Sequence, residues 1–196
     1  MMLKGLRNGF VVLMLLATAL AGCRPAGPKI PPGWATFTSE RHHYSAAYPP
    51  EWQVLAQEGD WTAESWGNPW EPGVDSYSLP TADPWTTYED PDVWILVTSR
   101  ETDPGESLRE WAARFPVWFT LISDMCQLVE ENKIVIVGGE PGVQFHEDCP
   151  YVHSAKTTML VHKGRGYYIS FWYPHGATQQ VIDLYEKFLG SFAFTR

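Results

Sequence analysis

The sequence predicts an α+β domain in which a mainly antiparallel sheet carries helices on its faces. Two observations lead to this fold class: short β-rich runs separated by glycine-rich turns, and two segments whose apolar side chains recur at helical spacing. Each such helix has one apolar stripe, which must pack on a face of the sheet. Residues 34–196 are long enough for a single domain with a sizeable core.

The first strands are predicted at 34–39, 44–49 and 51–57, where aromatic and β-branched residues alternate with polar ones around a double-proline break. This pattern is typical of antiparallel strands. A continuous apolar run at 93–100 is rich in β-branched residues and predicts a buried central strand.

A helix is predicted to begin at Ser107. Ser107 and Glu110 fit a capping box, in which the serine hydroxyl and the glutamate carboxylate satisfy free backbone amides. Pro116 either kinks this helix or ends it at Phe115. Apolar side chains follow near helical spacing, at Leu108, Trp111, Ala112, Phe115, Phe119 and Ile122.

Two hairpins are predicted next, because β-rich runs flank glycine-rich turns. The first joins 133–137 to 143–146, and the second joins 156–162 to 167–173. A helix and a last strand at 191–195 end the chain. The apolar stripe of this helix consists of Val181, Leu184, Tyr185 and Phe188.

Residues 1–22 are predicted to be a cleaved lipoprotein signal peptide. A basic segment with Lys4 and Arg7 precedes an apolar run of about 12 residues, which is too short to cross a hydrocarbon layer of about 30 Å. The run ends in Leu20-Ala21-Gly22-Cys23, which resembles the lipobox of bacterial lipoproteins, where cleavage leaves a lipidated cysteine as the first residue. The alternative is an ordinary cleaved signal with a coincidental cysteine.

Residues 23–33 are predicted to be a proline-rich tether. Its composition favours an extended spacer of about 3 Å per residue, which would hold the domain about 30 Å from the membrane. Acyl chains contribute about 0.8 kcal/mol per buried CH₂, so several chains on Cys23 would form a stable anchor. We therefore expect an exported protein that is lipid-anchored to a bacterial membrane, inner or outer, and faces the extracytoplasmic side.

The charge balance makes nucleic acid a poor partner. The chain has 14 basic and 23 acidic side chains, a formal charge of −9, and loss of Lys4 and Arg7 with the leader makes the rest more acidic. An acidic surface repels phosphate, which also disfavours direct binding to anionic lipid headgroups.

Cys126 and Cys149 form a candidate disulfide. Once Cys23 is lipidated, two cysteines are left, and an even number outside the cytoplasm favours pairing. Closing a loop of this length would contribute about 3 kcal/mol in the chain-entropy model. Two free thiols are the alternative.

Four motifs follow one another along 34–196. They are Tyr48-Pro49-Pro50-Glu51-Trp52, the Ser107-Leu108 helix start, Val135-Ile136-Val137-Gly138-Gly139-Glu140-Pro141, and Leu189-Gly190-Ser191-Phe192-Ala193-Phe194. In this order the chain resembles the PsbP-like family, named after an extrinsic subunit of the photosynthetic oxygen-evolving complex. The resemblance implies an α-β-α sandwich and a role in docking to, or assisting, larger assemblies, without shared catalytic machinery. The chain departs from the family in a Trp-rich acidic insertion at about 57–92.

This insertion is the first candidate site. It contains many carboxylates, no basic residue, and four tryptophans that could grip a partner protein, a sugar ring or a cationic ligand. Alternatively, the tryptophans fold back as a lid over the sheet. The candidate binding residues are Trp61, Trp66, Trp70 and Trp85.

A metal site is a weaker candidate. His146 and His153 flank carboxylates and Cys149, but their spacing fits no standard zinc pattern. The other histidines are expected at polar surfaces: His42, His43, His162 and His175.

The sequence has no motif of a nucleophile elbow, a phosphate loop, a zinc protease or a dinucleotide site. We therefore expect no enzyme activity, no catalytic residue and no cofactor. The favoured function is a membrane-anchored docking or assembly module with a protein partner in the membrane or envelope. Two alternatives stay open: a module that binds a small solute or divalent cation through the Trp-rich loop, and a hydrolase with a dispersed carboxylate site.

Overall fold

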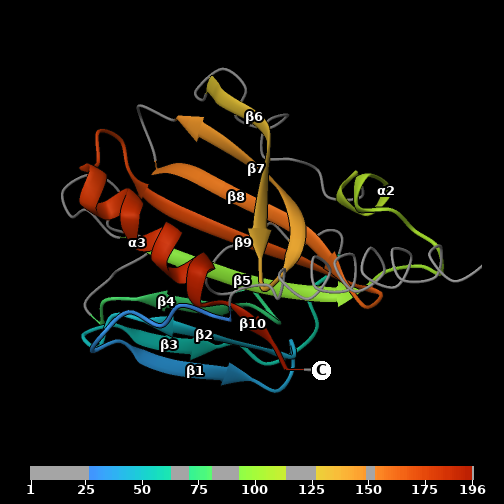
Figure 1. The fold of residues 1–196 in the computed structure, drawn as a ribbon, viewed down its shortest axis with the longest axis horizontal. Helices are drawn as coiled ribbons and strands as arrows, with labels where there is room; N and C mark the ends of the chain where they lie inside the picture. The colour runs from blue at the N-terminus through green and yellow to red at the C-terminus, as the bar shows by residue number, and fades with distance from the viewer. Residues whose placement is uncertain (1–26, 63–70, 81–92, 114–126, 149–152, 196) are drawn as a thin grey trace, which may run out of the picture.

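A computed structural model describes residues 27–62, 71–80, 93–113, 127–148 and 153–195 (Figure 1). Strands predominate, as the sequence predicts. In chain order the elements are β1 (Ala35–Ser39), β2 (Tyr44–Tyr48), β3 (Gln53–Ala56), β4 (Asp75–Ser78), β5 (Trp94–Glu101), α2 (Leu108–Ala112), β6 (Gln127–Val137), β7 (Glu140–Asp148), β8 (His153–His162), β9 (Arg165–Pro174), α3 (Gln179–Ser191) and β10 (Ala193–Phe194).

Most strands belong to a seven-stranded sheet with the order β3-β4-β5-β9-β8-β7-β6, and the others form a three-stranded sheet with the order β1-β2-β10. Every pair of neighbouring strands is antiparallel. In the small sheet, β10 brings Phe194 of the C-terminal end opposite Tyr44 of β2. The predicted antiparallel sheet is therefore confirmed.

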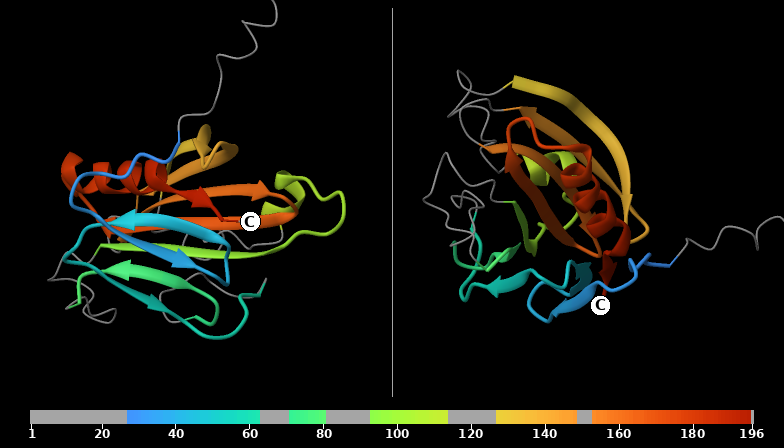
Figure 2. Two further views of the ribbon diagram at one scale, coloured as in Figure 1. Left: turned by 60° about the horizontal axis from the view of Figure 1, so that its bottom comes forward. Right: turned by 90° about the vertical axis from the view of Figure 1, so that its left-hand side faces the viewer.

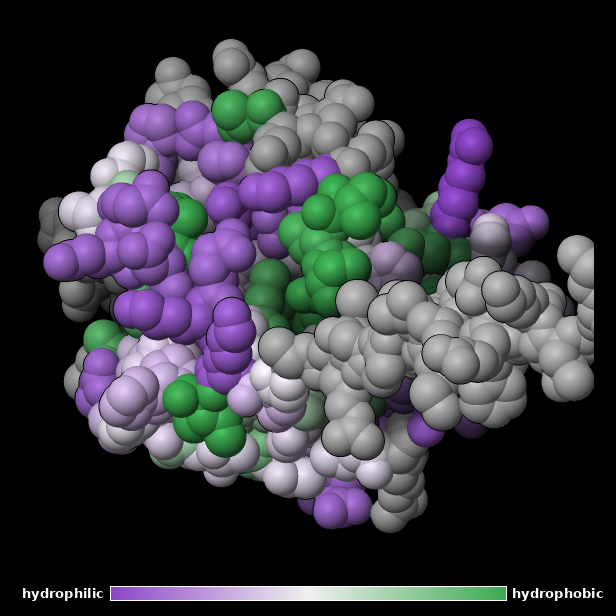
Figure 3. All heavy atoms as spheres, viewed as in Figure 1, coloured by the Kyte–Doolittle hydropathy of each residue, from purple (hydrophilic) through white to green (hydrophobic). Residues whose placement is uncertain are grey.

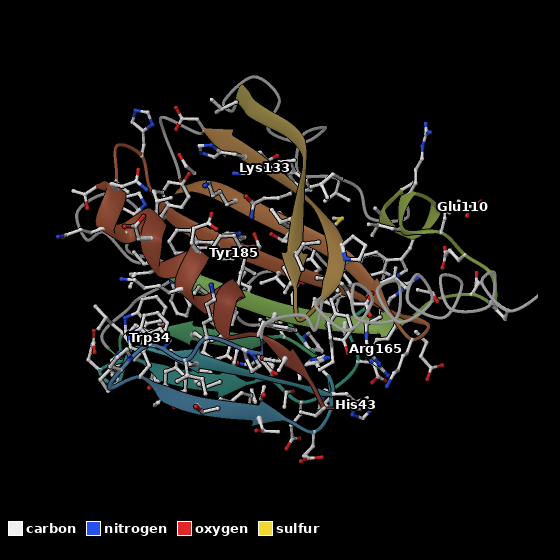
Figure 4. All side chains as sticks on the ribbon, in the orientation of Figure 1. Trp34, His43, Glu110, Lys133, Arg165 and Tyr185 are labelled. Atoms are coloured by element: carbon white, nitrogen blue, oxygen red, sulfur yellow. The ribbon has the colours of Figure 1, made fainter. Side chains whose placement is uncertain are left out.

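The first core lies between one face of the large sheet, α3 and the small sheet (Figure 2). Tyr185 and Phe188 of the predicted apolar stripe on α3 are fully buried. The Tyr185 ring stacks on Phe171, and its hydroxyl lies 2.8 Å from both Thr158 Oγ1 and the Ile169 carbonyl oxygen. Figure 4 shows Tyr185 between the helix and the sheet.

The opposite face of the large sheet carries a second core. Side chains alternate between the faces along a strand, so Tyr168 of β9 points away from α3, while Tyr167 and Ile169 join the first core. Trp111 of α2 is fully buried in the second core, where a Cβ atom on Gly166 would lie only 2.1 Å from its ring. Helices α2 and α3 therefore lie on opposite faces of the sheet.

The expected α-β-α sandwich is met only in part. A helix lies on each face, but α2 has only five residues, and the small sheet shares the first face with α3. The predicted capping box is present: Ser107 donates its backbone N–H to the Glu110 carboxylate at 2.8 Å, and Glu110 donates its own to the Ser107 hydroxyl. Residues 114–126, which include Pro116, lie outside the described residues.

Both predicted hairpins are present. Gly138 and Gly139 join β6 to β7, and Lys163 and Gly164 join β8 to β9; all four have positive φ, as in the type I′ turns that suit twisted strands. The last strand is shorter than predicted, because α3 continues through Ser191.

The segment 57–92 is not irregular throughout, which corrects the expectation of a long loop. Residues Asp75–Ser78 form β4, which pairs with β3 on one side and β5 on the other. All four side chains are buried, although three of them are polar. Apolar alternation therefore does not mark this strand in the sequence.

Candidate functional site

The two ends of the described chain lie near each other (Figure 2). A groove of about 650 Å³ is lined by residues from both ends. Lys29 donates its backbone N–H to the carbonyl of Gly190 at 2.8 Å, so the predicted tether at 23–33 is not free along its whole length. We name this groove the terminal groove. It is lined by Gly27, Pro28, Lys29, Ile136, Gly138, Gly139, His162, Lys163, Leu189, Gly190, Phe192, Ala193, Phe194 and Thr195.

The two hairpin turns position one wall of the terminal groove. His162, the last residue of β8, stacks on Phe194 with ring centroids 4.0 Å apart and pairs with the Glu140 carboxylate at 2.9 Å. A Cβ atom on Gly138 would lie 2.7 Å from the Phe194 ring, so glycine is needed for this close approach as well as for its positive φ. The expectation of a polar surface position for His162 is therefore wrong.

Two cations stand at the rim of the terminal groove. Lys29 and Lys163 are both exposed, and neither ammonium group forms an ion pair within the part of the chain that the structure describes. The lining also includes the buried apolar side chains of Leu189 and Phe192. The groove thus combines apolar lining with positive charge.

Strand β6 forms an edge of the large sheet, next to the terminal groove. Val135 and Val137 point into the first core, whereas Ile134 and Ile136 point to the other face and are 69% and 65% exposed. Figure 3 shows hydrophobic residues gathered over β6. We name residues 134–137 the β6 edge.

The Trp-rich segment is described only in part. Trp61 is 5% exposed and lies in the second core, with its ring 5.6 Å from that of Tyr168. Trp61 therefore does not present an exposed ring for binding. Its position agrees with the alternative, in which the segment folds back over the sheet. Trp66, Trp70 and Trp85 lie outside the described residues.

The candidate metal ligands do not converge. His146 contacts the Tyr173 hydroxyl on the first face of the sheet, and the next residue, Glu147, points to the opposite face. The side chain of His153, like Cys126 and Cys149, is not among the described ones. Within the described ranges, no three His, Cys, Asp or Glu side chains are grouped to hold a metal ion.

Glu147 is the least expected titratable group. Its side chain is buried, and its Oε1 atom has no hydrogen-bond partner among the described residues. Burial raises the pKa of the Glu147 carboxyl to about 7. The sequence offers one signal for this burial. Side chains alternate along β7, so residue 147 lies on the same face of the sheet as the apolar Phe145.

His42 is buried, which corrects the expectation of a polar surface. Its Nδ1 lies 2.9 Å from Ser99 Oγ, which also accepts a hydrogen bond from Arg165. Burial lowers the pKa of His42, while the nearby Asp75 carboxylate opposes this effect. The turn before β2 folds this imidazole inward, so that the Tyr167 hydroxyl donates to the His42 carbonyl. His175, in contrast, is exposed as expected and pairs with an aspartate.

No family model and no curated protein matches the chain. Among solved structures, the solution structure of cyanobacterial PsbP (CyanoP) from Synechocystis sp. PCC 6803 is 13% identical, with a TM-score of 0.56 over 90% of this chain and 99% of that chain. The fold is PsbP-like.

Two further solved structures match the chain with lower TM-scores. LpqN from Mycobacterium tuberculosis, described as involved in cell envelope biogenesis, is 13% identical and covers 85% of this chain and 87% of its own, with a TM-score of 0.49. The Ran-binding protein Mog1p from Saccharomyces cerevisiae is 12% identical and covers 83% of this chain and 95% of its own, with a TM-score of 0.48.

In the described part of the chain, no helix has the length and apolarity needed to span a membrane.

Proposed function

We propose that this protein is an exported, lipid-anchored and non-enzymatic accessory module that docks on a larger membrane or envelope assembly through the β6 edge. The observation that carries this proposal is an exposed, uncharged run of β-branched residues on an edge strand. Ile134 and Ile136 are both about two-thirds exposed, although the same strand sends Val135 and Val137 into the core.

Edge strands usually carry devices that block pairing with other chains, such as charges, prolines or bulges. Before residue 134, β6 carries such a charge at the exposed Lys133, and its register with β7 is shifted between Leu128 and Lys133. Residues 134–137 have none, and they pair with β7 in regular register. Among the described residues, no strand pairs with the outer side of β6, so 134–137 offer an edge to which a further strand can add.

The occupant that fits this edge is an extended segment of a partner protein with β-branched apolar side chains at alternate positions. Such a strand would continue the ladder beyond β6 and cover Ile134 and Ile136 with its own side chains. A small solute would leave the backbone groups of the edge unpaired. The PsbP-like fold supports this proposal as a fold-level analogy only.

The proposal is tested with a photo-crosslinking amino acid at position 134 of the full chain in its native membranes, and with the same residue at position 55 on the opposite edge, β3. We expect one dominant adduct from position 134. The crosslinked protein is then purified, and its affinity is measured for the parent chain, Ile134→Lys and Leu55→Lys. Loss of one buried apolar contact predicts an affinity about tenfold or more weaker for I134K, and no change for L55K.

Amide hydrogen exchange distinguishes strand addition from other contacts. Binding of the partner should protect the backbone amides of 134–137 and leave those of β3 unchanged. Equal crosslinking from both edges, or unchanged affinity of I134K together with unprotected amides at 134–137, would overturn the proposal.

A further inference from the structure

The distance between the terminal groove and the predicted lipid anchor is short. Gly27 lines the groove, and Lys29 is fixed to Gly190. Only three residues, Arg24 to Ala26, separate Gly27 from Cys23. At the greatest reach of a polypeptide, Cys23 therefore lies within about 14 Å of the groove. This bound is about half of the stand-off that the whole 23–33 segment would allow.

The predicted anchor would therefore place a bilayer next to a groove whose lining is amphiphilic. Lys29 and Lys163 are exposed cations that line the groove, and the apolar side chains of Ile136 and Phe194 line the same groove. Ammonium groups attract phosphate, and the apolar lining suits the glycerol and upper acyl part of a lipid.

We propose that the terminal groove binds an anionic phospholipid of the membrane that carries the anchor, with the phosphate held between Lys29 and Lys163. The inference rests on the lipid anchor of the proposed function, but not on the β6 edge as a docking site. The excess of acidic residues in the whole chain does not oppose it, because screening limits electrostatic effects to about 8–10 Å at physiological ionic strength.

Attachment to the same membrane makes even a weak site effective. A short tether converts lipid binding into an intramolecular event with a high effective concentration of headgroups. The bound lipid would also fix which side of the domain faces the bilayer. With the groove turned toward the membrane, the tether would bring Ile136, at the end of the β6 edge, close to the headgroups as well.

The test uses the lipidated full chain, purified from its host membrane and reconstituted into phosphatidylcholine vesicles with or without 20% phosphatidylglycerol. A trace of phosphatidylglycerol with a photoactivatable headgroup marks the protein surface that it touches, and mass spectrometry locates the adducts. We expect adducts on the peptides that contain 134–139, 162–163 and 189–195, and reduced labelling by an excess of unlabelled phosphatidylglycerol.

Charge reversal supplies the matched comparison. The double variant Lys29→Glu, Lys163→Glu should lose about tenfold or more of the groove adducts. The control, Arg109→Glu with Lys187→Glu, changes the charge equally at two exposed residues outside the groove and should label like the parent. Thermal melting confirms that all proteins are folded.

Labelling that is spread evenly over the surface, or that is equal in both double variants, would overturn the inference. Intact mass separates this failure from that of the anchor. If Cys23 carries no lipid, both the predicted anchor and the inference are wrong. If the chain is lipidated but gives no groove adducts, only the inference is wrong.

Discussion

At the scale of the residue, Glu147 has a carboxyl group that is buried on the large sheet, and its Oε1 atom has no hydrogen-bond partner in the described ranges. Desolvation disfavours the charged form, so the folded protein holds its proton up to a pH of about 7, compared with the ordinary pKa of 4.5. Between these pH values folding takes up a proton. Stability should therefore fall by about 3 kcal/mol as the pH rises from 4.5 to 7.

The variant Glu147→Gln tests this charge. It removes the ionisation and keeps the shape, so it should raise the free energy of unfolding at pH 8 by about 2–3 kcal/mol relative to the parent and change it little at pH 4.5. Urea unfolding at the two pH values measures the difference. The control Glu51→Gln, at an exposed residue, should move neither value, and an equal change at both pH values would contradict the prediction.

Titration of His42 should change stability with pH in the opposite direction to that of Glu147. Its pKa in the folded protein lies below the ordinary 6.5, because burial, Arg165 and Arg41 outweigh the attraction of Asp75. The unfolded chain then binds more protons below pH 6.5, so stability is complete above that pH and falls as the medium becomes more acidic.

The slope of stability against pH below 6.5 measures this contribution. It should become flatter in His42→Gln, which cannot take up a proton, even if that variant is less stable at every pH. Lys187→Gln, a change of charge at an exposed residue, serves as the control. A parental slope in His42→Gln would show that this imidazole is not the group responsible.

At the scale of the element, α2 depends on one glycine of β9. Any side chain at position 166 must displace the buried ring of Trp111, so Gly166→Ala should destabilise the protein by about 1–3 kcal/mol. Gly190→Ala is the matched control, because a Cβ atom there has no contact within 4 Å and lies in a helix. Calorimetry should show a lower Tm for G166A and an unchanged or higher Tm for G190A.

Helix α3 is fixed by the Tyr185 hydroxyl, which contacts Thr158 Oγ1 and the Ile169 carbonyl. Tyr185→Phe leaves these buried groups without that contact and should cost about 1–3 kcal/mol. In a double-mutant cycle, adding Thr158→Val to Tyr185→Phe should cost less than the sum of the two single changes. Simple additivity would show that the hydroxyl and Thr158 do not act together.

The elements that could be predicted are those with local signals. Paired glycines mark the turn at 138–139, and Ser107 with Glu110 marks the start of α2. Strand β4 has no such signal, since Asp75, Ser76 and Ser78 are polar and Tyr77 is its only large apolar side chain. Its conformation comes from pairing with β3 and β5, which a single segment cannot reveal.

At the scale of the whole molecule, the candidate sites were the hardest features to predict. The run at 134–137 is apolar in the sequence, but its exposure follows from the position of β6 at the edge of the strand order. The terminal groove could not be predicted either, because the net charge of the chain does not show where single cations gather. Lys29 and Lys163 are far apart in an acidic chain, and only the contact of Lys29 with Gly190 places them at one rim.

That contact also means that the chain nearly closes on itself. Gly27 and Thr195 line the same groove, so a short linker could join the chain at these two residues, and new ends could be opened at an exposed turn outside the groove, such as Pro104-Gly105. In such a circular permutant the anchor would leave the domain from another point of its surface while the strand order stays the same. The orientation of the domain on its membrane could thus be set by where the chain is opened.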